Sequence, residues 1–253
     1  MKNVQKHLEK AIESNPEFSD AHYELSLILI KKNEHQIAKK HLMKVIKIDP
    51  NYMKAYFQLG LLFKELNDNK KSKEFFKKAI ELDSEFSESY YHYGLLLIEM
   101  EDYEEAKNNF EKVTDIDQNY YKAYFNLANL MIDPEDYEKA KKNYLIAIDI
   151  KSDFAEAHFK LGKLLFKGLK NDESGTLVKK PDYDSSILHL EKAIKIKKNF
   201  IEALYYLGMV QRIKNNYEAS LKYLTAALKI DKNFSKAHFE IAMLYKNMIN
   251  ADK

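Results

Sequence analysis

The chain has 253 residues, of which 45% are hydrophobic, and its 41 Lys and Arg residues nearly balance its 39 Asp and Glu residues. Because recognition of phosphates and bases relies on clustered basic side chains and on the planar guanidinium, this balance and a single arginine, Arg212, disfavour nucleic acid as a partner. The chain has no cysteine, so it forms no disulfides. It also has no apolar run of about 18 residues, the length that a membrane span needs, and no apolar signal-peptide core. We therefore expect a cytoplasmic protein without membrane insertion.

A small residue recurs every 34 positions along nearly the whole chain. One step, between Gly162 and Gly208, is 12 residues longer, which indicates an insertion in an otherwise regular repeat. A period of about 20–50 residues is typical of stacked structural units and not of one globular core. The recurring residues are Ser26, Gly60, Gly94, Ala128, Gly162, Gly208 and Ala242.

The predicted units follow one another from the N-terminus. Residues 1–16 carry apolar residues at the spacing of a second helix and are expected to form an orphan outer helix. In each full unit the first helix is apolar around most of its circumference, as in residues 55–63, and the second is amphipathic, as in residues 72–80. We expect an all-α fold of about 14 helices in a single solenoid over 1–253. The predicted full repeats are 19–52, 53–86, 87–120, 121–154, 155–200 and 201–234, followed by a terminal helix at 235–253.

The insertion near 168–182 lies between the two helices of the fifth unit, since the regular register resumes at Ser186. One interpretation is a tolerated surface loop, because long surface insertions cost little conformational entropy. The other is a lobe that contacts a partner through Thr176, Leu177 and Val178.

The same kinds of residue return at fixed positions of each unit. Position 7 is apolar or aromatic, positions 8 and 20 are small, and position 24 is Leu, Phe or Tyr. This pattern resembles the tetratricopeptide repeat, W-x2-L-G-x2-Y…A-x3-F…P, although position 4 carries His, Tyr or Leu in place of Trp. The resemblance extends along the chain and implies a right-handed α-solenoid of stacked antiparallel helix pairs. Positions are counted from Ser19, Met53, Ser87, Tyr121, Ala155, Ile201 and Ser235, and the inserted residues are left out of the count.

Motifs that would indicate catalysis are missing from the sequence. It has no Gly-rich phosphate loop, no nucleophile elbow and no His-Glu-x-x-His zinc helix. His22, His158 and His238 share position 4, where we interpret them as packing substitutes for an aromatic residue. We therefore expect a protein that is not an enzyme and that holds neither a cofactor nor a metal ion.

Position 5 is aromatic in every unit. In the family that the chain resembles, this position lines the concave face of the superhelix, so the resemblance implies an aromatic stripe along a partner-binding groove. Packing between units is an equally good explanation. A receptor for chaperone tails is disfavoured, because its carboxylate clamp has Lys at this position. The predicted stripe consists of Tyr23, Phe57, Tyr91, Phe125, Phe159, Tyr205 and Phe239.

The middle of the predicted groove is polar to basic. Asn126, Asn129, Lys160 and Lys163 form a patch that suits an acidic side chain of a partner, and apolar anchors with a few polar groups are typical of grooves that hold peptides. We expect a non-catalytic scaffold that binds a peptide or helix of a partner protein in this groove. One alternative is the recognition arm of a larger enzyme, such as a protein sugar transferase with such repeats, although only Asn126 fits the Asn ladder of those arms.

The second alternative is a structural element that assembles with itself. A terminal unit normally presents a polar outer face, yet both end helices carry apolar residues. We expect that these ends are covered within a longer solenoid, or that copies associate weakly through them. The apolar residues concerned are Val4, Leu8 and Ile12 at one end and Leu244, Met248 and Ile249 at the other.

Overall fold

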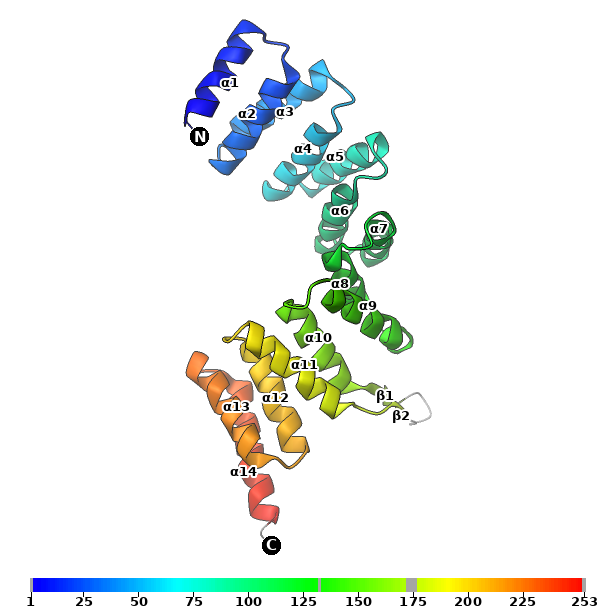
Figure 1. Ribbon diagram of the computed structural model, residues 1–253, viewed down its shortest axis with the longest axis vertical. Helices are drawn as coiled ribbons and strands as arrows, with labels where there is room; N and C mark the ends of the chain where they lie inside the picture. The colour runs from blue at the N-terminus through cyan, green and yellow to red at the C-terminus, as the bar shows by residue number, and fades with distance from the viewer. Residues whose placement is uncertain (1, 132, 172–176, 252–253) are drawn as a thin grey trace. The chain divides into compact units, whose positions relative to one another are not determined.

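The structure is a computed structural model that describes residues 2–131, 133–171 and 177–251 (Figure 1). These residues form fourteen α-helices, one short 3₁₀ helix and one hairpin of two short strands, so the prediction of an all-α fold of stacked helices is confirmed. Contacts divide the chain into two compact units, Met1–Gln118 with α1 to α7 and Asn119–Lys253 with α8 to α14. None of the helices in the described ranges is long and apolar enough to cross a membrane. The α-helices are α1 (Lys2–Ser14), α2 (Ser19–Lys31), α3 (His35–Ile48), α4 (Met53–Glu65), α5 (Asn69–Leu82), α6 (Ser87–Glu99), α7 (Tyr103–Ile116), α8 (Tyr121–Leu130), α9 (Tyr137–Ile150), α10 (Ala155–Lys167), α11 (Tyr183–Ile196), α12 (Ile201–Ile213), α13 (Tyr217–Ile230) and α14 (Ser235–Ala251).

In the first unit the helices pair in chain order, α2 with α3, α4 with α5 and α6 with α7 (Figure 1). The first helix of a pair is buried on several sides, because it also packs against the second helix of the preceding pair. Helix α4, for example, buries Ala55, Leu59 and Phe63. The second helix buries a narrower stripe, which in α5 includes Ser72 and Phe76. This difference in burial accounts for the apolar and amphipathic patterns of the two helices.

The second unit has the same arrangement, with the pairs α8/α9, α10/α11 and α12/α13, and α14 packs on α12 and α13. Helix α8 ends early, at Leu130, and a 3₁₀ helix, η1 (Pro134–Asp136), leads into α9. Proline lacks an amide hydrogen and disfavours helical geometry in the residue before it. Pro134 therefore accounts for the shorter first helix of this repeat.

The turn between the two helices of a repeat depends on one residue in the left-handed region. Position 15 has φ between 58° and 62° in four repeats. Asn tolerates this conformation better than most other residues, and it fills the position in three of the four. The carboxylate of Asp68, one residue later, then caps α5 by accepting a hydrogen bond from the Lys71 amide at 3.2 Å. The left-handed residues are Asn33, Asn67, Glu101 and Asn215.

The glycines at position 8 lie where paired helices approach most closely. A Cβ atom added to Gly60 would lie 2.6 Å from Cδ1 of Phe76, and one added to Gly208 would lie 2.5 Å from Cγ of Leu224. The Gly60 carbonyl also accepts a hydrogen bond from the Ser72 hydroxyl of the paired helix at 2.7 Å. Close packing therefore explains why glycine occurs inside these helices despite its cost of about 1 kcal/mol in helix propensity.

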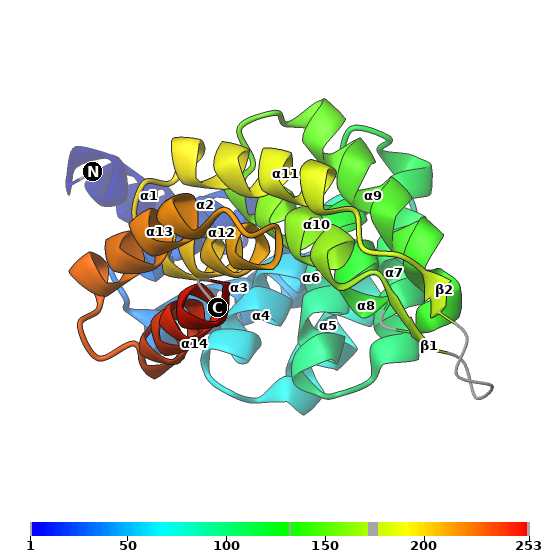
Figure 2. The same ribbon diagram turned by 90° about the horizontal axis from the view of Figure 1, so that it is seen from below.

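The insertion of the fifth repeat contains a β-hairpin at the ends of α10 and α11 (Figure 2). Strand β1 (Leu169–Asn171) pairs antiparallel with β2 (Leu177–Lys179), where a plain loop was one expectation. Gly168 starts the hairpin with φ 58°, and a Cβ atom there would lie 2.6 Å from the Lys179 carbonyl oxygen. Lys179 pairs with Glu138 of α9, and its Nζ lies 5.1 Å from the centroid of the Tyr137 ring. The base of the hairpin is therefore attached to the preceding repeat, and Thr176 of the predicted lobe lies outside the described residues.

Deletion of residues 172–180 is expected to leave the helices folded. Among the described residues, Lys179 of the hairpin makes an ion pair and a cation–ring contact with α9, and exposed contacts of this kind contribute about 1 kcal/mol or less. Far-ultraviolet circular dichroism and the cooperativity of urea unfolding are the measurements. Loss of helix content or a broadened transition would show that the hairpin supports the fold.

Candidate functional site

The predicted aromatic stripe of the first unit is almost completely buried. Tyr23, Phe57 and Tyr91 are 9%, 9% and 8% exposed. Tyr23 and Phe57 are each covered by the aromatic at position 34 of the same repeat, as in Phe57 and Phe86, whose ring centroids are 5.1 Å apart in an edge-on arrangement. These three side chains therefore act mainly in packing, and they leave little area for a partner.

In the second unit the aromatic residues at position 5 differ in exposure. Phe159 is 8% exposed beneath Phe200, with ring centroids 4.7 Å apart, while Phe125 and Tyr205 are half-buried. Phe239 on α14 is 63% exposed. Phe125, Tyr205 and Phe239 are thus the members of the predicted stripe with substantial accessible area.

The sequence holds a signal that would have indicated this burial. Position 34 is aromatic in every repeat, and in five repeats its ring packs against the aromatic of position 5. Two aromatic residues that recur at fixed positions of a repeat are more easily explained as a packed pair than as two separate surfaces. The residues at position 34 are Tyr52, Phe86, Tyr120, Phe154, Phe200 and Phe234.

The predicted polar patch lies on the first helices of the second unit, and we call their common surface the first-helix face. Asn126 and Asn129 belong to α8, and Lys160 and Lys163 belong to α10. All four side chains are partly buried. The Asn129 side-chain oxygen accepts a hydrogen bond from the Tyr144 hydroxyl at 2.9 Å, which leaves the Asn129 amide hydrogens to donate elsewhere.

The two lysines of this patch carry positive charge that the described residues do not neutralise. In the part of the chain that the structure describes, no carboxylate lies within ion-pair distance of Lys160 or Lys163. Burial and the neighbouring Lys163 lower the pKa of Lys160 from its usual value. The Lys163 Nζ lies 5.5 Å from the centroid of the Tyr206 ring on α12, close enough for a cation–π contact.

Two basic residues on other first helices, Lys64 and Arg212, are paired with carboxylates. Lys64 on α4 lies 2.9 Å from a carboxylate oxygen of Glu99 on α6. The Arg212 guanidinium lies 2.9 Å from the carboxylate of Glu240, which is 5% exposed and joins α14 to α12. Lys160 and Lys163 differ from these two cations because no carboxylate of the described residues lies within ion-pair distance of them.

A pair of histidines lies between α2 and α3. His22 Nε2 is 3.0 Å from the Pro16 carbonyl oxygen, so it donates there, and its Nδ1 is left to accept from Nδ1 of His41 at 2.8 Å. Burial and the neighbouring His22 lower the pKa of His41. The histidine at position 4 therefore does more than replace an aromatic ring, because it takes part in a part-buried hydrogen bond between the two helices.

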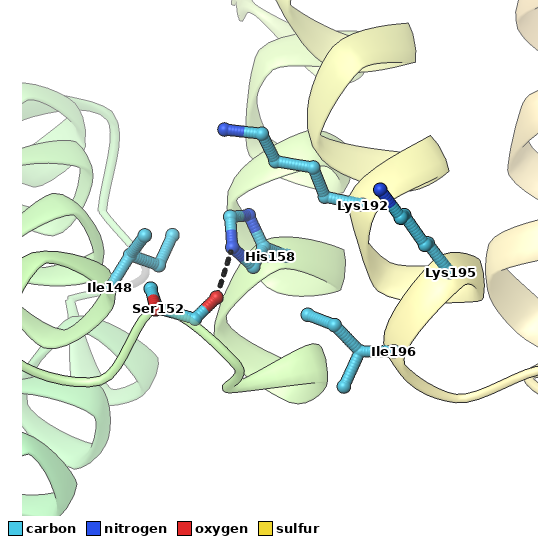
Figure 3. Close-up of a pocket in the computed structure, with 6 residues that line it drawn as sticks. All are labelled: Ile148, Ser152, His158, Lys192, Lys195 and Ile196. Carbon is cyan, nitrogen blue, oxygen red and sulfur yellow. Dashed lines mark hydrogen bonds between the residues drawn. The ribbon is translucent and has the colours of Figure 1, made fainter.

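The fifth repeat contains a second pair of the same kind. His158 and His189 have their Nδ1 atoms 3.0 Å apart. Figure 3 shows the second contact of His158, whose Nε2 is 3.2 Å from the Ser152 carbonyl oxygen. Burial lowers the pKa of His158, and burial together with His158 and Lys192 lowers the pKa of His189 to about 4.

His158 also borders a pocket of about 290 Å³ beside α9 and α11 (Figure 3). The pocket is lined further by Ile148, Ile196 and two exposed lysines, Lys192 and Lys195. Since both ring nitrogens of His158 are engaged, this histidine does not present a free base to the pocket.

Comparisons with known proteins agree with this architecture. Models of the tetratricopeptide repeat match residues 19–52, 54–86 and 87–120, and again residues 201–234. A further model, described as TPR repeat, matches residues 132–168. No curated protein matches the chain in sequence.

Several solved structures share the fold. YrrB, described as a TPR protein with an unusual peptide-binding site, is 23% identical over 78% of this chain and 96% of its own, with a TM-score of 0.63. The pilF protein of Pseudomonas aeruginosa is 18% identical over 89% and 97% of the two chains, with a TM-score of 0.72. The C-terminal part of a TPR repeat-containing protein from Cytophaga hutchinsonii is 13% identical over 95% and 96%, also with a TM-score of 0.72. Repeat models along both units and stacked helix pairs in each lead to one conclusion: the chain belongs to the tetratricopeptide repeat family.

Proposed function

We propose that the protein is a non-catalytic scaffold that binds an acidic segment of a partner protein on the first-helix face of its second unit. The observation that carries this proposal is the unpaired, partly buried lysine pair, Lys160 and Lys163, of which Lys163 lies over the Tyr206 ring. A carboxylate placed there gains charge-assisted hydrogen bonds from two cations.

The electrostatics of α10 favour an anion at this place. Lys160 and Lys163 are three residues apart on one helix, and like charges at this spacing destabilise a helix by about 0.2–0.5 kcal/mol. Partial burial adds to the cost, as the lowered pKa of Lys160 reflects. A bound carboxylate offsets the repulsion between the two lysines and compensates part of the cost of their burial, so the free protein is prepared for an anion at this place.

Half-buried aromatic rings on α8 and α12 suit a peptide more than a small ion. Phe125, Tyr205 and Tyr206 are half-buried, so each offers part of a ring to an apolar side chain of a partner. Apolar anchors around a few polar groups are the usual design of surfaces that hold peptide segments. The peptide-binding description of YrrB, which shares this fold, supports the same class of ligand.

The double substitution Lys160→Glu and Lys163→Glu is expected to weaken binding of an acidic peptide at least about tenfold, because it replaces attraction by repulsion at a partly buried contact. The probe is a fluorescein-labelled peptide of repeated Glu-Glu-Leu, and its affinity is measured by fluorescence anisotropy. Wild-type affinity is expected to fall as salt is added.

Helix α11 provides the matched control. Lys192 and Lys195 have the same spacing as the two lysines of α10, but they are exposed on a second helix. The pair Lys192→Glu and Lys195→Glu changes the net charge equally and is expected to reduce affinity much less. Equal losses in both variants would indicate general charge attraction and would contradict a site on α10, as would an absence of binding to the wild-type protein.

A further inference from the structure

The last helix exposes a surface that is buried on the preceding first helices. In α2, His22, Ser26 and Leu29 at positions 4, 8 and 11 are at most 6% exposed, because α3 covers them. In α14 the residues at the same positions are exposed, and Tyr245 at position 11 is 50% exposed. Among the described residues, no second helix packs on this side of α14. Its exposed residues include His238, Phe239, Ala242, Tyr245 and Ile249.

Helix α1 at the N-terminal end of the chain exposes the complementary surface, that of a second helix. Counted back by 34 residues from α3, α1 has the register of a second helix, with Val4 at position 20. Leu8 and Ile12 pack on the core of the first unit. Val4 is 56% exposed, whereas Ala38 and Ser72, at position 20 of the next two second helices, are 0% exposed. The side of α1 that carries Leu8 and Ile12 is thus packed. The side that carries Val4, which in other second helices contacts the first helix of the same repeat, is exposed.

We infer that α1 of one copy packs on α14 of a second copy and supplies the second helix that α14 lacks, so that copies of this chain join head to tail. The two helices together then form a repeat of the same kind as the six within the chain. This inference concerns the two end helices and is independent of the lysine patch on α10.

The histidines support this register. Position 4 and position 23 hold a contacting histidine pair in two repeats, His22 with His41 and His158 with His189. In the other four repeats neither position is histidine. The one remaining histidine at position 4 is His238 on α14, and α1 carries His7 at position 23. Histidines therefore occur at these positions as matched pairs throughout, provided that α14 and α1 are counted as one repeat.

An aromatic pair supports the same register. Five repeats cover the aromatic of position 5 with the aromatic of position 34, with ring centroids 4.7–5.5 Å apart. Among the residues that the structure describes, no aromatic ring covers Phe239 at position 5 of α14, and Phe239 is 63% exposed. Phe18 follows α1 at position 34, and it is 44% exposed. In the head-to-tail contact Phe18 covers Phe239, as Tyr52 covers Tyr23 within the chain.

The other contact positions of α1 also match those of the internal second helices. Leu8 stands at position 24, where Leu42, Leu190 and Leu224 are 0% exposed. Ala11 stands at position 27, where Ala79, Ala147, Ala193 and Ala227 also occur. Helix α1 of a second copy therefore has, at each of these positions, the kind of residue that packs on a first helix within the chain.

The test is the mass of the full chain in solution over a wide range of concentration, by sedimentation and light scattering. The wild-type protein is expected to form linear oligomers whose average mass increases with protein concentration. Val4→Asp and Phe239→Asp each place a charge in the contact, and each is expected to reduce the association constant at least about tenfold. Both side chains are more than half exposed in the free protein, so neither change removes a core contact.

Mixing the two variants distinguishes head-to-tail packing from other contacts. Val4→Asp retains an intact α14, and Phe239→Asp retains an intact α1, so the mixture is expected to form heterodimers that grow no further. Leu188→Asp, which changes a residue of α11 that is 52% exposed, is the control and is expected to associate as wild type. A wild-type monomer at every concentration overturns the inference, as does loss of association in only one of the two variants, which indicates contact between like ends.

Discussion

Replacement of Gly60 by leucine is expected to destabilise the first unit by about 3 kcal/mol or more, near the upper end for an overpacked core. A Cβ atom at this position already lies 2.6 Å from Cδ1 and 2.7 Å from Cε1 of the Phe76 ring, which is itself fully buried. The leucine side chain therefore cannot fit unless α4 and α5 separate, and their separation breaks the hydrogen bond from Ser72 to the Gly60 carbonyl. The measurement is the midpoint of thermal and urea unfolding followed by circular dichroism.

The first repeat offers a control for this prediction. It has Ser26 at position 8 and Leu42 at position 24, and both are 0% exposed. The double variant Gly60→Ser and Phe76→Leu reproduces this pair in the second repeat, and it is expected to recover much of the stability that Gly60→Ser alone loses. An unchanged midpoint in Gly60→Leu would show that α4 and α5 do not approach as the structure indicates.

Acidification is expected to destabilise the second unit by about 1–2 kcal/mol between about pH 7.5 and pH 5, after allowance for solvent screening of a half-buried group. The folded protein lowers the pKa of His189 to about 4, whereas an unfolded histidine titrates near 6.5. The unfolded state therefore binds the proton first as pH falls. The stability contributed by the neutral pair is complete above the unfolded pKa and is lost as pH decreases toward the folded pKa.

The charged groups around His189 mostly act in the same direction as its burial. Lys192 and Lys141 disfavour protonation of His189, and Asp182 alone favours it. Protonation of both rings would also replace the hydrogen bond between the Nδ1 atoms of His158 and His189 by repulsion. Urea unfolding across this pH range measures the effect.

A variant without histidine at these two positions separates this effect from the titration of carboxylates. The sixth repeat has Leu204 at position 4 and Tyr223 at position 23. His158→Leu combined with His189→Tyr introduces that pair into the fifth repeat, and its stability is expected to depend less on pH than that of wild type. Equal pH dependence in the two proteins would assign the loss of stability to other groups.

The repeat register could be predicted from the sequence because it depends on packing that every unit shares. A small residue at position 8 and small or apolar residues at positions 20 and 24 recur in each pair of helices, so their spacing predicts the contacts directly. The shortening of α8 and the hairpin after Gly168 occur once each. The shortening of α8 is explained by Pro134, and the hairpin is held to α9 by contacts of Lys179. Neither feature recurs in other repeats, so the repeat pattern does not predict it.

The candidate site was harder to predict, because accessible area depends on what a neighbouring residue covers. Position 5 is aromatic in every unit, yet Tyr23 and Phe57 are nearly buried and Phe239 is exposed. The difference comes from the aromatic at position 34, which covers the first two rings. The lack of a carboxylate partner for Lys160 and Lys163 likewise depends on spatial neighbours that sequence spacing does not identify.

The main contacts of each helix within a unit are with the helices next to it in the chain, and this locality bears on how such a protein is made and how it changes. Segments that are close in sequence meet without closing long loops, so folding is expected to proceed as the chain leaves the ribosome and to be fast. Because each repeat contacts mainly its neighbours, the number of repeats can change during evolution. Duplication or loss of one 34-residue unit replaces one junction by an equivalent junction, while a change of any other length disturbs the pairing unless it falls in a turn, as the insertion after α10 does.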